Sequence, residues 1–272
     1  MPNGRSPSVG IIIPARYASS RFPGKPLVRL RGAGGVERSL IEHSWIAASK
    51  VPGIASVCVA TDDSRIAEEV RRFGGDVVMT PAECANGTER CAAAISGRSD
   101  APELIVNLQG DAPLTPPDVV AALVARMAAD PQLPVATPAL RCTDPVYRHL
   151  IEDQAAGRVG GTTVVFDGAG DALYFSKRVI PYVPEQMISQ AAQAVHLHLG
   201  VYAYRREALE TYAATPPSLL EQLEGLEQLR FLVQGVRVAV VVCDSPGWDV
   251  VEVNNPSDIA PVEAALQHRP LR

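Results

Sequence analysis

Short apolar runs rich in β-branched residues recur along the chain and alternate with helical patterns. Val9–Ile13 is one such run, and Ile54–Ala60 and Leu104–Leu108 are two more. A continuous apolar run of this length is typical of a strand buried on both faces. A helix is predicted over 65–73, after the suitable N-cap Ser64. Strands that alternate with helices indicate parallel βαβ units, so we predict an α/β fold with a mostly parallel, doubly wound sheet.

The composition is that of an ordinary globular protein and excludes several classes of function. The chain has 272 residues, of which 47% are hydrophobic and 20% charged. The formal net charge of -5 argues against a nucleic-acid-binding protein, and no apolar stretch approaches the ~20 residues of a membrane span. The five cysteines are scattered without a Cys-x-x-Cys pair, which argues against a zinc site and a disulfide framework and favours the cytoplasm. We expect a short disordered lead at 1–8 and a single domain over 9–272.

A cationic loop follows the first apolar run. Pro14 cannot donate to a sheet ladder, so we expect the strand to end there. Arg16, Arg21 and Lys25 follow, and Pro23-Gly24 predicts a turn. Ligands of an open parallel sheet bind at the carboxyl ends of strands, and guanidinium and ammonium groups make charge-assisted hydrogen bonds to phosphate. The loop is a candidate triphosphate site, although a solvated basic loop has the same composition.

Two further segments carry candidate site residues after predicted strands. Asn86-Gly87 indicates a turn, and Thr88 is a candidate cap for the following helix. Gln109-Gly110-Asp111 directly follows the strand predicted at 104–108. A carboxylate there, beside a polyphosphate, suits Mg²⁺, which takes hard oxygen ligands, although aspartate is also common in turns.

The second half of the chain is less regular. The pattern weakens over 141–171, and we expect an antiparallel excursion that rejoins the sheet. A strand is predicted from His196 to Tyr204, with His196 and His198 on one face. Two imidazoles without an obvious third ligand favour a structural or substrate-facing role over a metal site. Ser218 and Glu221 form a capping box that opens a helix predicted from Leu219 to about Gln234.

Several of these segments together resemble one enzyme family. Residues 11–27, IIIPARYASSRFPGKPL, are similar to the opening signature of the CMP-Kdo synthetases, the cytidylyltransferases that activate 3-deoxy-manno-octulosonate (Kdo). The blocks GTER (87–90), VNLQGD (106–111), ALYFS (172–176), HLGVYAY (198–204) and LEQLR (226–230) extend the similarity over about Val9 to Ala265. The resemblance implies transfer of CMP from CTP to a 3-deoxy-2-keto sugar acid with release of pyrophosphate. It also implies Mg²⁺ as the cofactor, a homodimer and a role in lipopolysaccharide biosynthesis.

The resemblance also implies roles for individual residues. Catalytic roles fall on Arg16, Lys25 and Asp111, and metal ligation on Asp111 and Asn254. Nucleotide contacts fall on Pro14, Ala15, Arg16, Arg21, Lys25, Gly87, Thr88, Arg90 and Gln109. Contacts to the sugar acid fall on Lys177, His198, Tyr202, Glu227 and Gln228, and the region 141–204 is implied to form the dimer contact and frame this acceptor site.

Four positions depart from the family pattern. Ala112 stands where a glutamate is usual, Thr163 and Lys177 replace a lysine and an arginine, and Asn254 replaces the second metal-binding aspartate. An asparagine oxygen can ligate Mg²⁺ without charge, and Glu252 on the same strand face is a second candidate. Because the departures fall at the metal and acceptor end, we hypothesise that the acceptor is a relative of Kdo. A nonulosonic acid or phosphonate acceptor, and a non-catalytic nucleotide-binding protein, are the alternatives.

Overall fold

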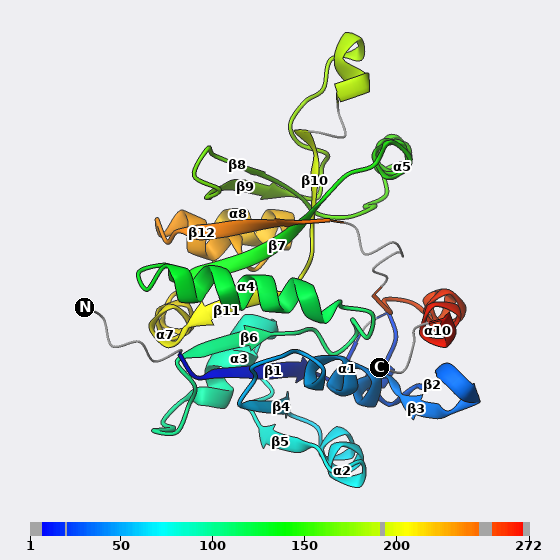
Figure 1. Cartoon of the computed structure of the whole chain (residues 1–272), viewed down its shortest axis with the longest axis vertical. Coiled ribbons are helices and arrows are strands. Elements are labelled where there is room, and N and C mark those ends of the chain that lie inside the picture. The colour runs from blue at the N-terminus through cyan, green and yellow to red at the C-terminus, as the bar shows by residue number, and fades with distance from the viewer. Residues whose placement is uncertain (1–6, 20, 191–193, 245–251, 269–272) are drawn as a thin grey trace.

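A computed structural model describes residues 7–19, 21–190, 194–244 and 252–268 of the chain (Figure 1). Its strands are β1 (Val9–Ala15), β2 (Arg29–Arg31), β3 (Glu37–Ser39), β4 (Ser56–Thr61), β5 (Asp76–Met79), β6 (Leu104–Asn107), β7 (Val135–Arg141), β8 (Thr163–Phe166), β9 (Ala172–Ser176), β10 (His196–His198), β11 (Tyr202–Arg205) and β12 (Val238–Cys243). Its α-helices are α1 (Leu40–Ser49), α2 (Ser64–Arg72), α3 (Gly87–Ile95), α4 (Pro117–Ala129), α5 (Asp144–Ala155), α7 (Arg206–Ala214), α8 (Leu219–Glu224), α9 (Leu229–Val233) and α10 (Ile259–His268). The lead expected at 1–8 lies outside the described residues except for its last two positions.

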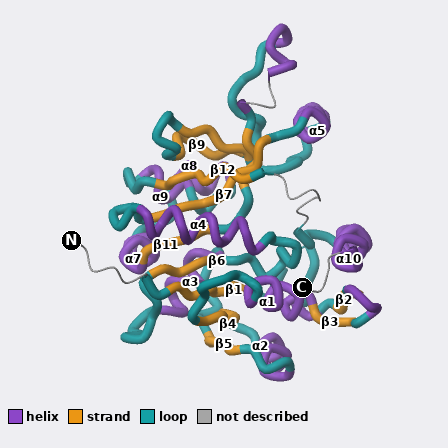
Figure 2. The backbone as a smooth tube through the Cα atoms, in the orientation of Figure 1, coloured by secondary structure: helices purple, strands orange, loops and turns teal. Residues whose placement is uncertain are grey.

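One large sheet forms the centre of the structure. Its strand order is β5-β4-β1-β6-β11-β7-β10-β8-β9, and β12 lies beside β7. Strands β5, β4, β1 and β6 are parallel, as are β7 and β12, whereas β8 to β11 pair antiparallel with their neighbours. Figures 1 and 2 show the strands stacked from β5 at the bottom to the pair β8 and β9 at the top. The predicted α/β class is confirmed. Of the antiparallel strands, β8 lies in the irregular region 141–171, and β9, β10 and β11 follow it.

Strand β1 is buried on both faces, which explains its uninterrupted apolar run. Ile11 and Ile13 pack in one core cluster with side chains of α1, α2 and α4. Ile12 packs in a second cluster with side chains of α3, α7 and α9. Successive side chains of a strand point to opposite faces, so every position of β1 must be apolar when helices cover both faces.

The order of strands around β1 fixes where a ligand can bind. The chain runs from β1 to β4 and β5 on one side, and β6 then pairs with the other side of β1. In doubly wound sheets the ligand crevice lies outside the carboxyl ends of the strands at such a reversal. The carboxyl ends of β1 and β6 carry the cationic loop and Gln109-Gly110-Asp111, respectively, so the two sequence motifs meet there.

Strand β1 continues through Pro14 to Ala15, so the prediction that it ends at Pro14 was wrong by one residue. Pro14 and Ala15 pair in register with Ala60 and Thr61 of β4, whereas the pairing with β6 stops at Ile12. Pro14 therefore lies where β1 has one neighbour only, and a proline is tolerated at such an edge.

The strand predicted from His196 to Tyr204 is two strands, β10 and β11, which both pair with β7. The register changes between them, because Leu197 faces Leu140 while Ala203 faces Ala136. The extra residues form a bulge opposite Pro138, which has no N–H to donate to the ladder.

The helix predicted from Leu219 to Gln234 is also divided. Gly225 takes the left-handed conformation (φ 61°, ψ 41°) and ends α8, and α9 starts at Leu229. The capping box of Ser218 and Glu221 is confirmed at the start of α8. Helix α5 was not predicted, although Thr143 caps it.

Two predicted caps are shifted by one or two residues. Asp63 caps α2 in place of Ser64, and Asn86 caps α3 in place of Thr88. No helix among the described residues is long and apolar enough to cross a membrane.

Candidate active site

The cationic loop after β1 is folded back on itself and fixed at two points. The Gly24 N–H donates to the Tyr17 carbonyl (2.9 Å), and Gly24 is in the left-handed region (φ 72°). A side chain on Gly24 would also meet the Tyr17 ring at 3.1 Å. Arg65 lies over the other side of this ring, 3.3 Å from its centroid, and is ion-paired with Asp63. The turn between Arg16 and Lys25 is therefore held against α2.

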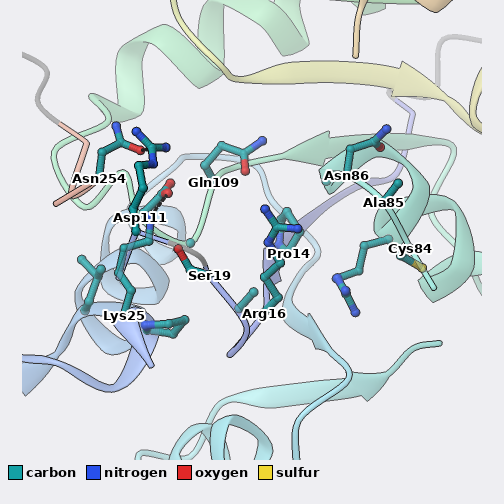
Figure 3. A pocket seen from close by; sticks show the side chains of 17 residues that line it. Pro14, Arg16, Ser19, Lys25, Cys84, Ala85, Asn86, Gln109, Asp111 and Asn254 are labelled. Atoms are coloured by element: carbon teal, nitrogen blue, oxygen red, sulfur yellow. Dashed lines mark hydrogen bonds and ion pairs between the residues drawn. The ribbon is translucent and has the colours of Figure 1, made fainter. Parts of the chain in front are cut away.

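A cleft lies between this loop, the end of β6 and the start of α3 (Figure 3). It is lined by Pro14, Ala15, Arg16, Ser19, Arg21, Lys25, Pro26, Leu40, Cys84, Ala85, Asn86, Gly87, Arg90, Gln109, Gly110, Asp111 and Asn254. Gly110 allows the ends of β1 and β6 to approach, because a Cβ there would lie 2.9 Å from the Pro14 carbonyl oxygen. The cleft brings together residues that are up to 240 positions apart in the sequence, from Pro14 to Asn254.

Acidic and basic side chains meet at one end of the cleft. Lys25 Nζ lies 2.5 Å from Asp111 Oδ2, and this pair is largely buried. Arg21 donates to Asn254 Oδ1 (3.1 Å). The Val253 N–H donates to the Asp111 carbonyl (2.9 Å), which ties the segment that carries Asn254 to the end of β6. Figure 3 shows Lys25, Asp111 and Asn254 together on one side of Arg16.

Glu252 contacts Asn254 and lies close enough to Asp111 for their charges to interact. Burial raises the pKa of the Glu252 carboxyl to about 7, and the negative charge of Asp111 adds to this effect. Asn254 Nδ2 donates to Glu252 Oε2 over a long 3.4 Å. The oxygens of Asp111, Asn254 and Glu252 are hard ligands of the kind that Mg²⁺ binds, so this donor set fits that ion. No group of three or more His, Cys, Asp or Glu side chains that could hold a metal ion is found among the described residues.

The opposite side of the cleft is the N-terminus of α3. Asn86 Oδ1 accepts from the Glu89 N–H (2.9 Å) and Asn86 Nδ2 donates to the Tyr212 hydroxyl (2.9 Å). Gly87 allows close approach, because a Cβ there would lie 3.1 Å from Gln109 Nε2. Arg90 lines the cleft, but its guanidinium already donates to Thr80 Oγ1 (2.7 Å).

Thr88 does not line the cleft. Its hydroxyl is buried against the Tyr204 hydroxyl (2.7 Å), and its N–H donates to Glu227 Oε2 (3.0 Å). Burial raises the pKa of Glu227, and the hydrogen bonds from Thr88 oppose this rise. In this conformation Glu227 joins the start of α3 to the segment between α8 and α9.

The residues expected to bind the acceptor form a second group that does not line the cleft. The Tyr202 hydroxyl donates to Gln228 Oε1 (3.0 Å), and the rings of Tyr202 and His198 are 5.5 Å apart. Lys177 lies at the end of β9, where its N–H donates to Glu224 (3.0 Å). Gln228 is 1% exposed and its Nε2 has no partner among the described residues. A buried amide donor without a hydrogen-bond partner costs free energy of folding. The Gln228 Nε2 donor therefore indicates a place where a ligand oxygen can accept a hydrogen bond.

His198 is neutral within this group. Its Nε2 is 2.9 Å from the Thr137 hydroxyl, and burial lowers its pKa to about 3. The Thr137 hydroxyl also lies 2.8 Å from the Val201 carbonyl, so one side chain connects β7 to both sides of the bulge. Sequence reasoning missed Thr137, because only the pairing of β7 with β10 and β11 reveals its position.

The two groups approach each other at the break between β10 and β11. A Cβ on Gly200 would lie 3.6 Å from Glu252 Oε1 and 3.9 Å from Gln109 Cγ. Gln109 lines the cleft, whereas Gly200 belongs to the HLGVYAY block. The sheet thus places the predicted nucleotide residues and the predicted acceptor residues on neighbouring strands.

Some residues of the cleft were not predicted, and one departure from the family pattern has a structural role. Ser19, Cys84, Ala85, Asn86 and Gly110 line the cleft. The Asn-Gly turn signal was the only available indication of Asn86. Thr163 donates to the Arg178 carbonyl (2.7 Å) and accepts from the Ile180 N–H (3.1 Å), so it fixes the chain after β9.

Comparison with known proteins identifies relatives that match this chain over nearly its whole length. A cytidylyltransferase family model matches residues 10–238. A 3-deoxy-manno-octulosonate cytidylyltransferase of Maricaulis maris is 42% identical over 95% of this chain and 97% of its own. An 8-amino-3,8-dideoxy-manno-octulosonate cytidylyltransferase of Shewanella piezotolerans is 40% identical over 95% and 98%.

Solved structures give the same result. A CMP:2-keto-3-deoxy-manno-octonic acid synthetase, solved in complex with CTP, superposes with a TM-score of 0.81 at 36% identity and covers 95% of this chain and 98% of that one. A 4-diphosphocytidyl-2C-methyl-D-erythritol synthase of Anaerococcus prevotii, at 14% identity and a TM-score of 0.59 over 97% of both chains, shares the fold. The chain therefore belongs to the cytidylyltransferase family and is a nucleotidyltransferase enzyme.

Proposed function

We propose that this enzyme transfers CMP from CTP to Kdo and releases pyrophosphate. The observation that carries the proposal is the cationic cleft at the ends of β1 and β6, in a chain that superposes along nearly its whole length on a CTP-bound CMP-Kdo synthetase. The acceptor hydroxyl attacks the α-phosphorus, a new P–O bond forms, and the bond to the β-phosphate oxygen breaks. The hydroxyl proton leaves to solvent, because no side chain is assigned as the general base.

The cationic loop is proposed to hold the triphosphate and to take up the charge of the leaving pyrophosphate. Arg16 is exposed in the cleft and makes no hydrogen bond or ion pair with another described residue, so its guanidinium is free to bind phosphate. Lys25 and Arg21 are already aimed at the cleft by their contacts with Asp111 and Asn254. Cations that are placed before the reaction stabilise developing charge without a cost of reorganisation.

Asp111 and Asn254 are proposed to hold Mg²⁺, which fits the hard oxygens gathered there. When bound, the ion polarises the phosphate and neutralises part of its charge. Gly87, Thr88, Arg90 and Gln109 are proposed to position the cytidine. Support comes from the close approach of Gly87 to Gln109 and from the hydrogen bond of the Thr88 N–H to Glu227 Oε2, which fixes the start of α3 beside the cleft.

The acceptor is proposed to bind between β9, β11 and the α8–α9 segment. The unpaired amide of Gln228 is available to a sugar hydroxyl, and the Tyr202 hydroxyl orients that amide. His198 is neutral, so it contributes a hydrogen bond rather than a charge, and Lys177 supplies the cation for an acid. A Kdo-like acid remains the alternative acceptor, and Lys177 in place of arginine is the residue that favours it.

A homodimer in the cytoplasm is also proposed. The region 141–204 exposes large apolar side chains, with Leu173 62% and Tyr182 86% exposed, as expected of a surface that a second copy covers. The five cysteines are free, which agrees with a reducing compartment.

The test is pyrophosphate release with CTP, MgCl₂ and Kdo, compared with UTP and with 8-amino-3,8-dideoxy-manno-octulosonate. We expect CTP and Kdo to give the highest kcat/KM. Asp111→Asn should lower kcat by roughly 10²-fold or more, because it removes one carboxylate from the metal site and the partner of Lys25. Asp100→Asn, at an exposed site, is the matched control. Turnover of another acid with a far higher kcat/KM than Kdo would contradict the proposed acceptor.

A further inference from the structure

The carboxyl oxygens of Glu252, two positions before Asn254, lie close to Asp111. Val253 is fully buried and its N–H donates to the Asp111 carbonyl (2.9 Å), so the backbone between the two side chains is fixed against the end of β6. The 3.4 Å contact of Asn254 Nδ2 with Glu252 Oε2 brings both side chains to the same place. The aspartate that the family pattern has at 254 is thus missing, but the Glu252 carboxyl group contacts Asn254, which lines the cleft.

Asn254 is suited to hold this carboxylate. Its Oδ1 accepts from Arg21 (3.1 Å) and its Nδ2 faces Glu252, so the amide offers an oxygen to the cleft and a donor to the carboxylate. An aspartate at 254 has no donor and would set a second negative charge against Glu252. A glutamate at 252 and a neutral asparagine at 254 are therefore compatible neighbours, and the two positions together carry one carboxyl group.

Two cationic side chains already contact the oxygens of Asp111 and Asn254, which shows that this group of oxygens attracts positive charge. Lys25 is bound to Asp111 and Arg21 to Asn254, so two of the three cations of the loop reach this group of oxygens. Mg²⁺ is usually held by one or two carboxylates, with water and substrate phosphates completing its octahedron. We propose that Glu252 is the second carboxylate of the metal site, with Asn254 as its neutral partner. This inference rests on the proposed function, and it means that Asn254 is no sign of a lost activity.

The test measures metal binding directly, with Mn²⁺ as the probe and no nucleotide present. Free Mn²⁺ is followed by electron paramagnetic resonance in titrations of the wild type, Glu252→Gln and the double variant Glu252→Gln/Asn254→Asp. Glu103→Gln, an exposed glutamate at the amino end of β6, is the matched control and should bind Mn²⁺ like the wild type. We expect Glu252→Gln to weaken binding by about tenfold or more. We expect the double variant, which returns the charge to 254, to bind more nearly like the wild type than like Glu252→Gln.

A loss smaller than tenfold in Glu252→Gln overturns the inference, and so does a double variant that stays closer to Glu252→Gln than to the wild type. Thermal melts establish that each variant is folded. If Glu252→Gln does not fold, the double variant decides alone: Mn²⁺ binding within tenfold of the wild type supports the inference, and weaker binding overturns it. Pyrophosphate release is measured separately. A wild type that binds Mn²⁺ but does not use Kdo refutes the acceptor only, whereas one that binds no Mn²⁺ refutes the metal site and this inference together.

Discussion

His198 makes the stability of this protein depend on pH in a way that can be calculated. Its ring lies between Phe175 and Tyr202 and is bound to Thr137, and burial lowers its pKa to about 3. In the unfolded chain the same side chain titrates near 6.5. The unfolded state therefore binds a proton at a pH at which the folded state does not. This contribution to stability is fully present above pH 6.5 and is lost as the pH falls below that value.

The magnitude follows from the two pKa values. Each pH unit below the unfolded pKa costs about 1.4 kcal/mol while the folded histidine stays neutral, so the loss between pH 7 and pH 5 is about 2 kcal/mol. The full difference would cost about 5 kcal/mol, but it is reached only below pH 3, where the folded histidine is protonated as well. The value at pH 5 depends little on the folded pKa, because pH 5 is well above it.

The assay compares urea unfolding of the wild type and of His198→Gln at pH 7 and pH 5. Glutamine keeps a hydrogen-bonding group beside Thr137 but does not titrate. Burial also lowers the pKa of His43 and His196, and these contributions cancel because both proteins contain them. We expect the wild type to lose about 2 kcal/mol more than the variant between the two pH values. Equal losses would show that His198 takes up its proton in the folded state, and would refute the argument.

Three substitutions test other parts of the fold. Gly110→Ala would place a Cβ 2.9 Å from the Pro14 carbonyl oxygen. We therefore expect the free energy of unfolding in urea to fall by about 1–3 kcal/mol and the KM for CTP to rise. Unchanged values would show that the ends of β1 and β6 can separate freely. Gly225→Ala meets φ 61° and the Lys177 ammonium at 2.7 Å, so it should cost about 1 kcal/mol and raise the acceptor KM more than the CTP KM. Arg230→Ala leaves buried carboxylates unpaired and should cost about 3–5 kcal/mol by the same unfolding assay, whereas a loss below about 1 kcal/mol would mean that water replaces the guanidinium.

The parallel half of the sheet was predictable because its signals are local. Val9 to Ile13 has to be a strand buried on both faces, and the apolar runs at 54–60 and 104–108 contain β4 and β6. The capping box at Ser218 was predictable for the same reason, since it depends on residues three apart. The cationic loop and Asp111 were predicted to lie near each other only because parallel strands end at one edge.

The missed features depend on contacts between distant residues. The bulge between β10 and β11 is defined by how both strands pair with β7, and nothing in His196 to Tyr204 alone indicates that neighbour. The role of Glu227 is similar, because its carboxylate turns back to the Thr88 N–H from 139 residues away. Helix α5 was missed because its apolar pattern is weak, although Thr143 is a good cap.

The sequence by itself determined the class of fold, the position of the cationic loop and the resemblance to a family, because these depend on patterns of neighbouring residues. Only the tertiary structure decided which side chains share the cleft. It brought Asn254 into a hydrogen bond with Arg21, 233 positions away, and it brought Glu252 close to Asp111. The physical reason is that charges interact through space, so the balance of carboxylates and cations in a site is set where the chain returns to itself.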